Sequence, residues 1–174
     1  MPVKTISEKE INPSDFQPLL NDLKAEWKNP REWGLPIIIE DRTPRTKSVR
    51  LYVIWDKWTE LPRDIRSQII NEAFREIHKN TDERITLSLG YDVDEAVAVK
   101  MLPYKIILLL KAEKEGIKDK CEKTMMKYGA WKRGEELELR FAELEDAEKI
   151  YELLKKEIPG DYWVITQEMF PDES

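Results

Sequence analysis

The chain has 174 residues, of which 41% are hydrophobic and 37% are charged, and its formal net charge at pH 7 is −6. This hydrophobic content excludes a disordered chain, the length suits one domain with a real core, and the negative balance argues against a generally basic surface for nucleic acid. One histidine, one cysteine and six glycines leave no set of residues for an ordinary zinc site, for Ser-His or Cys-His catalysis, or for a glycine-rich phosphate loop.

The first predicted elements are a helix and a β-hairpin. Apolar residues at helical spacing predict a helix over residues 13–28, and Pro30 ends it. Two β-branched runs follow at 37–39 and 49–55, and only a short polar segment separates them. We therefore expect adjacent antiparallel strands, of which the second is central because it is apolar on both faces.

Helices and strands alternate through the rest of the chain. Their hydrophobic periods predict, in chain order, a helix at 62–79, a strand at 84–89, a short helix at 92–101, a strand at 104–110, a helix at 113–128, a strand at 137–141, a helix at 143–157 and a strand at 162–166. Gly134 can supply the turn of a hairpin before the strand at 137–141. Residues 104–166 would then have the order β-α-β-β-α-β of a ferredoxin-like sandwich.

These elements predict an α+β protein built as a two-layer sandwich. We expect one mixed or antiparallel sheet of about 5 to 7 strands covered by helices, with a ferredoxin-like C-terminal half. An N-terminal helical arm (1–34) would pack on a single α+β domain (35–174). The inward positions of both periods predict one shared core that contains Val53, Trp55, Ile69, Leu87, Ile107, Leu109, Leu139 and Ile150.

Two parts of the chain have similar patterns. The segments 62–110 and 113–167 each read α-β-α-β, and in each a strand is followed by a break and a helix that begins with acidic residues. A duplicated unit explains this similarity. The ordinary alternation of helices and strands also produces it, so both interpretations stay open.

The sequence also indicates the environment of the protein. Its single cysteine cannot form an internal disulfide, its apolar runs are far shorter than the ~20 residues that span a bilayer, and the first ten residues contain no apolar stretch typical of a signal peptide. We expect a cytoplasmic protein without a membrane partner. The many lysines and glutamates, with few glutamines, are typical of heat-adapted proteins.

The segment from Trp55 to Trp58 is the strongest candidate for a catalytic site. It places Asp56 between two tryptophans at the end of a predicted central strand. An acid that aromatic rings shield from water can act in proton transfer, and ligands often bind at the ends of central strands. The alternative is that Asp56 is solvated and that Trp55 and Trp58 serve packing, which is the commoner role of large aromatic residues.

A second candidate is the basic loop 42–50, which carries Arg42, Arg45, Lys47 and Arg50. Such a loop can bind phosphate or an acidic partner. The alternative is that the charges serve only to keep the surface soluble, as they commonly do in hairpin loops. No aromatic residue alternates with these cations, as RNA recognition usually requires, so binding of nucleic acid is not favoured.

The remaining polar residues have ordinary structural explanations. Asp92, Asp94 and Glu95 lie where acidic residues cap a helix and interact with its dipole, so they do not indicate a magnesium site. His78 lies in the last turn of a predicted helix, and Cys121 lies on an apolar helical stripe. The sequence therefore predicts no metal site and no cofactor.

Three hypotheses about function remain. The leading one is a non-catalytic protein-interaction or regulatory module, which binds an unknown protein or a second copy of itself through a sheet edge or through its tryptophans. One alternative is a small carboxylate-based enzyme, with or without magnesium, that uses Asp56 as its general base. The other is binding of nucleic acid through the 42–50 loop.

Overall fold

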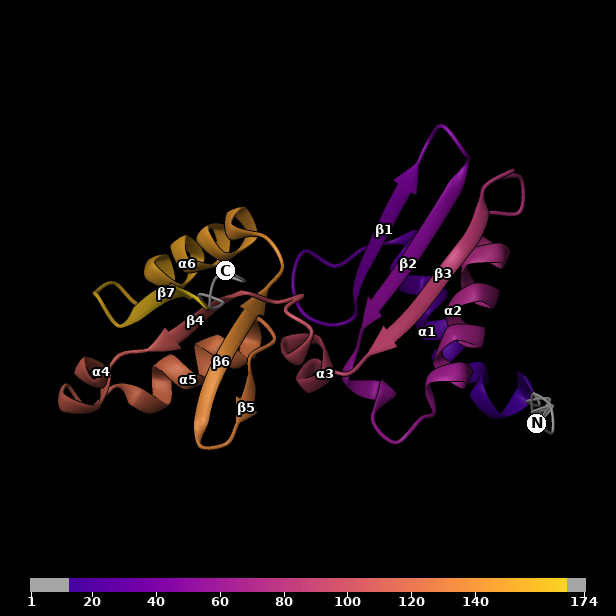
Figure 1. Ribbon diagram of the computed structural model, residues 1–174. Helices are drawn as coiled ribbons and strands as arrows, with labels where there is room; N and C mark the ends of the chain where they lie inside the picture. The colour runs from indigo at the N-terminus through magenta and orange to yellow at the C-terminus, as the bar shows by residue number, and fades with distance from the viewer. Residues whose placement is uncertain (1–12, 169–174) are drawn as a thin grey trace, which may run out of the picture. The chain divides into compact units, whose positions relative to one another are not determined.

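The structure is a computed structural model that describes residues 13–168 (Figure 1). It confirms the α+β class. Contacts divide the chain into two compact units. The first unit contains the described residues up to Arg31 together with Pro36–Asp92, and the second contains Glu32–Leu35 and the described residues from Val93 onward.

The first unit has a three-stranded sheet in the order β1-β2-β3. Strand β2 is central, antiparallel to β1 and parallel to β3, so the predicted hairpin is confirmed. The elements are η1 (Pro13–Phe16), α1 (Gln17–Lys28), β1 (Ile37–Thr43), β2 (Ser48–Ile54), η2 (Asp56–Trp58), α2 (Arg63–Ile77) and β3 (Arg84–Tyr91).

Helices α1 and α2 lie on the same face of this sheet (Figure 1). Leu51 and Val53 of β2 are buried on that side, as is Phe74 of α2. Trp27 of α1 packs edge to face on Phe74 with ring centroids 5.7 Å apart, and its Nε1 donates a hydrogen bond of 2.7 Å to Glu40 of β1. The helical layer therefore depends on long-range aromatic packing as well as on local helical spacing.

The second unit has a four-stranded sheet in the order β5-β6-β4-β7, in which every pair of neighbours is antiparallel. The short strand predicted around Gly134 exists as β5. The elements are α3 (Val93–Ala98), β4 (Tyr104–Leu108), α4 (Leu110–Lys114), α5 (Lys118–Lys127), β5 (Trp131–Arg133), β6 (Glu136–Phe141), α6 (Leu144–Glu157) and β7 (Trp163–Gln167).

The core of the second unit lies between one face of its sheet and the helices α5 and α6. Ile106 of β4 and Leu139 of β6 contribute from the sheet, and Met125 and Leu154 contribute from the helices. One helix predicted over 113–128 is in fact two, because Gly116 has a φ of +71° between α4 and α5. A left-handed glycine commonly follows the end of a helix, and here the chain then starts a new one.

Two predictions about the sheet and the core are wrong. The part of the chain that the structure describes has two sheets, of three and four strands, instead of one sheet of five to seven. The predicted shared core is divided, with Val53 in the first unit and Leu139 in the second, and Leu87 is 38% exposed. In β4 the buried residue is Ile106 and not Ile107. Both errors arise because alternation shows that a strand is half-buried without showing which strand it pairs with.

The predicted division into an arm (1–34) and one domain (35–174) concerns which parts fold on their own, and it stays a prediction. The first twelve residues of that arm lie outside the described residues. The proposed duplication also stays a prediction. The segment 62–110 contributes strands to both sheets, whereas the segment 113–167 contributes strands only to the second.

Candidate functional sites

The tryptophans of the Trp55 to Trp58 segment are buried packing residues. Their rings meet edge to face with centroids 5.1 Å apart, and Trp58 is fully buried. The Nε1 of Trp58 donates a hydrogen bond of 3.0 Å to the Val53 carbonyl. Gly90 of β3 leaves room for this ring, because a Cβ on Gly90 would lie 3.0 Å from the Trp58 Nε1. Neither tryptophan offers a surface anchor for a partner.

Asp56 itself is exposed in the short helix η2. Its backbone carbonyl accepts hydrogen bonds from the backbone and the hydroxyl of Thr59. Its neighbour Lys57 forms an ion pair with Asp22 at 2.7 Å and lies over the Trp55 ring. A general base needs removal from water and a partner in a cleft, so this exposure does not favour the catalytic hypothesis.

The cations of the 42–50 loop are largely neutralised by acidic residues. Arg42 pairs with Glu40 and, at 2.9 Å, with Glu83, and Lys47 pairs with Asp82. The hydrogen bond to Glu40 raises the pKa of Arg42 above its ordinary value.

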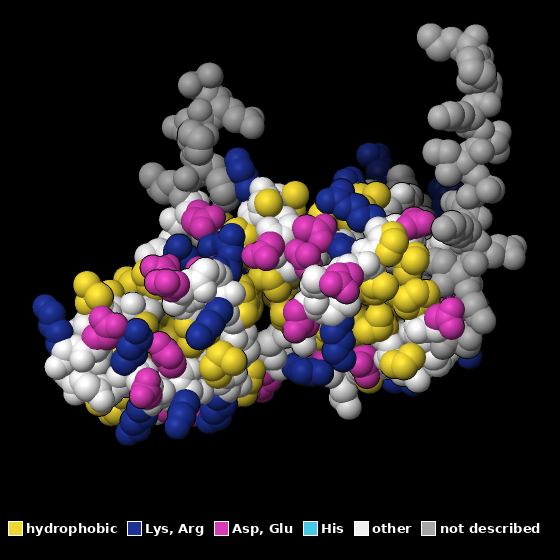
Figure 2. Space-filling view, turned by 90° about the horizontal axis from the view of Figure 1, so that it is seen from below, with side chains coloured by type: hydrophobic (Ala, Val, Ile, Leu, Met, Phe, Trp, Pro, Cys, Tyr) yellow, Lys and Arg dark blue, Asp and Glu magenta, His cyan; other side chains and the backbone are white. Residues whose placement is uncertain are grey.

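In the same loop, Arg50 lies 3.9 Å from Asp41, and Arg45 is exposed. Figure 2 shows basic and acidic side chains interspersed over the face of the molecule in view. The ion pairs of Arg42, Lys47 and Arg50 keep this loop from producing the field of one sign that steers phosphate binding.

The outer edge of β3 is occupied by side chains of α2. In a parallel pair alternate residues of an edge strand direct their carbonyls away from the neighbouring strand, and Ser88 and Gly90 are in this position. Ser67 Oγ donates to the Ser88 carbonyl at 2.7 Å, and Arg66 Nη1 donates to the Gly90 carbonyl at 3.1 Å. These bonds oppose the addition of another strand at this edge.

The face of the three-stranded sheet opposite α1 and α2 carries apolar side chains. Ile39, Tyr52 and Leu89 lie side by side across β1, β2 and β3, because Ile39 pairs with Tyr52 and Tyr52 pairs with Leu89. The next row contains Arg50 opposite Leu87. All of these side chains are at least partly exposed. We call this surface, defined by Ile39, Arg50, Tyr52, Leu87 and Leu89, the open face.

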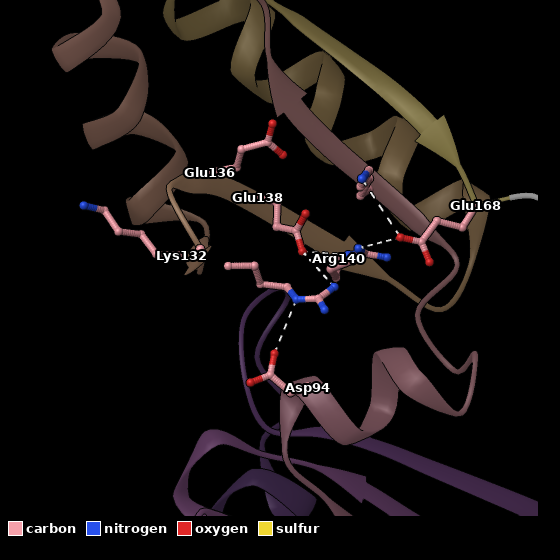
Figure 3. A pocket seen from close by; sticks show the side chains of 9 residues that line it. Asp94, Lys132, Glu136, Glu138, Arg140 and Glu168 are labelled. Carbon is pink, nitrogen blue, oxygen red and sulfur yellow. Dashed lines mark hydrogen bonds and ion pairs between the residues drawn. The ribbon is translucent and has the colours of Figure 1, made fainter.

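The second unit contains a polar cavity of about 450 Å³ next to β6 (Figure 3). Four basic and four acidic side chains line it, together with Gly134, so the ionisable groups balance in charge. The lining residues come from α3, from strands β4 to β6, from the turn between β5 and β6 and from the residue after β7. They are Asp94, Lys105, Lys132, Arg133, Gly134, Glu136, Glu138, Arg140 and Glu168.

Arg140 is the centre of this cavity's ion network, and its side chain is only 1% exposed. Its Nε donates to Glu138 at 3.0 Å, its Nη1 donates to the Leu102 carbonyl at 3.1 Å, and its Nη2 donates to Glu168 at 2.8 Å. Burial alone would lower the pKa of Arg140, but the hydrogen bonds to Glu168 and Glu138 outweigh it and raise the pKa. The guanidinium therefore stays charged and fixed in position.

Arg133 and Lys105 extend this network toward solvent. Arg133 Nη1 lies 3.5 Å from Glu138, and its Nε lies 3.3 Å from Asp94, whose side chain is 81% exposed. Lys105 Nζ lies 4.0 Å from Glu168. Figure 3 shows Glu138, Arg140 and Glu168 together, with Asp94 projecting from α3 and Lys132 extending away from the group.

The ion pair of Glu168 predicts a pH dependence of stability. The hydrogen bond from Arg140 lowers the pKa of Glu168 from its ordinary value of 4.5, although burial opposes this shift. A lowered folded-state pKa stabilises the protein above pH 4.5, and this contribution disappears as the pH falls through the folded-state pKa. We expect Glu168→Gln to reduce the free energy of unfolding at pH 7 and to have a diminishing effect in acid. Denaturant titrations of both proteins across this range test it, and a difference that does not depend on pH would contradict it.

Sequence reasoning missed the most buried charges of the molecule. Glu138 and Arg140 alternate with apolar residues in β6, which is also the pattern of an ordinary solvated strand face. His78 follows the last residue of α2, and burial raises the pKa of Cys121. Between residues 13 and 168, no group of three or more His, Cys, Asp or Glu side chains is placed to hold a metal ion.

None of the helices within residues 13–168 has both the length and the apolar character needed to cross a bilayer. Comparison of the chain with protein-family models, with curated proteins and with solved structures found no match.

Proposed function

We propose that the protein is a non-catalytic interaction module and that its partner binds the open face of the three-stranded sheet. The observation that carries this proposal is the row of Ile39, Tyr52 and Leu89, which is partly exposed on the side of the sheet away from α1 and α2, with the 38% exposed Leu87 beside it. Contiguous exposed apolar side chains bordered by polar ones are typical of protein interaction sites. The ion pair of Arg50 with Asp41 supplies such a border.

The open face fits a packed partner better than an added strand. The outer carbonyls of Ser88 and Gly90 already accept hydrogen bonds from α2. Three strands form a strip roughly 10 Å wide, which is about the diameter of one α-helix. The face of such a strip is small beside the ~800 Å² that each partner buries in a standard interface. The expected contact is therefore an amphipathic helix of another protein, at modest affinity.

The test is the loss of a captured partner when a charge is placed on the open face. Leu87→Glu should reduce capture of that partner from native lysate about tenfold or more, because the buried contact would then desolvate a carboxylate. Met126→Glu is the matched control, since Met126 is also an exposed apolar residue, at 56%, but lies on α5 in the second unit. Circular dichroism and thermal unfolding should show that both variants keep the fold.

Three outcomes would contradict this proposal. The wild-type protein could capture nothing, the two variants could lose the partner equally, or the captured material could be lost on nuclease treatment. The last outcome would support the nucleic-acid alternative. The catalytic alternative would be supported if the wild-type protein turned over a substrate in an activity screen and Asp56→Asn abolished that turnover. Neither alternative has an observation in its favour that equals the open face.

We also propose that the second unit has a ferredoxin-like fold. In chain order its strands and main helices read β4, α5, β5, β6, α6, β7, and the all-antiparallel order β5-β6-β4-β7 supports the assignment. This fold does not itself indicate a function, because unrelated functions share it.

We further propose a cytoplasmic location, which the single buried cysteine supports. We also propose adaptation to heat, which the many lysines and glutamates support.

A further inference from the structure

The polar cavity of the second unit contains a preformed set of opposite charges. The side chains of Arg140 and Glu138 are 1% and 3% exposed, and the Leu102 carbonyl helps to hold Arg140 in position. Groups that are fixed before a ligand arrives lose little entropy when it binds. The volume of about 450 Å³ lies within the roughly 300–1,000 Å³ of small-molecule sites.

Part of the charge in this cavity remains available to a ligand. Within residues 13–168, Glu136 lines the cavity without an ion pair, and Lys105 reaches Glu168 only at 4.0 Å. The bond of Arg133 to the exposed Asp94 is a surface ion pair, which contributes little to stability. Arg133 can therefore exchange the Asp94 carboxylate for the carboxylate of a ligand at small cost.

The charge balance of the lining selects the class of ligand. A ligand with one net charge would leave an uncompensated charge beside the side chains of Arg140 and Glu138, which are themselves removed from water, and an unpaired charge next to such groups is costly. A zwitterion brings one charge of each sign and keeps the balance. We propose that the cavity binds a small zwitterion, and that a free α-amino acid is its ligand class. The ligand carboxylate binds Arg133 and Lys105, and its ammonium group binds Glu138 and Glu136.

The test compares L-alanine with its two charged halves on the full-length protein. Propionate lacks the ammonium group, and ethylamine lacks the carboxylate. Titrations followed by the amide chemical shifts of the cavity residues should show that L-alanine binds about tenfold or more tightly than either half, because each half forfeits one set of charge-assisted hydrogen bonds. The other standard amino acids are titrated in the same way, since a larger side chain can improve the fit.

Variants then locate the binding site. Arg133→Met should weaken amino-acid binding about tenfold or more, and Arg133→Lys should retain part of it. Lys57→Met is the matched control, since Lys57 is an ion-paired cation of the first unit, and it should bind as the wild type does. The proposal is overturned if no standard amino acid binds, if propionate or ethylamine binds as tightly as L-alanine, or if Arg133→Met has no effect. Leu87→Glu should leave this binding intact, so its outcome is independent of the open face.

Discussion

Replacing Arg140 with methionine should lower the free energy of unfolding by about 3–5 kcal/mol, because it leaves the buried carboxylate of Glu138 without its main partner. Glu138 is 3% exposed, and Arg140 also satisfies the Leu102 carbonyl and Glu168. Glu138 would still have Arg133 Nη1 nearby, at 3.5 Å. Chemical denaturation of the variant and the wild type measures the loss.

A double variant separates the charge effect from simple loss of packing. Glu138→Leu combined with Arg140→Met removes both buried charges, and an apolar pair of similar volume can be nearly as stable as a buried ion pair. We expect the double variant to be more stable than Arg140→Met alone, with a coupling energy well above the error of the measurement. The coupling energy compares the double variant with the single variants Glu138→Leu and Arg140→Met. If the losses of stability in these two single variants simply add in the double variant, the ion pair is not coupled as the structure indicates.

Replacing Trp58 with alanine should destabilise the first unit by about 3–5 kcal/mol, which is the usual cost of removing a large buried aromatic side chain. The ring is fully buried, packs on Trp55 and lies next to Gly90. Because thermal unfolding of two units need not be a single transition, fluorescence and calorimetry should be compared.

Phenylalanine at the same position is the matched control for this effect. Trp58→Phe keeps an aromatic ring but loses the hydrogen bond from Nε1 to the Val53 carbonyl. We expect a loss smaller than that of Trp58→Ala, because most of the apolar burial remains. Equal losses in the two variants would mean that the hydrogen bond, and not the packing, dominates the contribution of Trp58. No loss in either variant would show that the ring is not a core residue.

The Trp55 to Trp58 segment and the open face differ in how their apolar side chains are placed. Its tryptophans contribute to stability, while Asp56 remains in water. The open face has the opposite character, because Tyr52 and Leu89 are partly exposed although they belong to the sheet. Apolar residues that a fold leaves exposed on one face are better candidates for binding than apolar residues that it buries.

Local residue patterns were sufficient to predict most helices and strands of this protein. The β-branched run of β2, the helical stripe of α2 and the turn at Gly134 each depend on residues that are close in the chain. Apolar spacing also located the outward and inward faces of most elements. The exceptions are β3, where Leu87 is exposed and Ser88 is buried, and β4, where the buried residue is shifted by one.

The pairing of the strands and the burial of particular charges, in contrast, depend on the tertiary fold. Within residues 13–168, β3 pairs with β2 and with no other strand, and β4 pairs with β6 and β7, so one expected sheet became two. The sequence does not show whether an arginine in a strand is buried or exposed. Arg140 is buried between two carboxylates, whereas Arg42 is exposed in the β1–β2 hairpin. Strand pairing and desolvation depend on contacts between residues far apart in the chain, and the hydrophobic period of a short segment carries no information about those contacts.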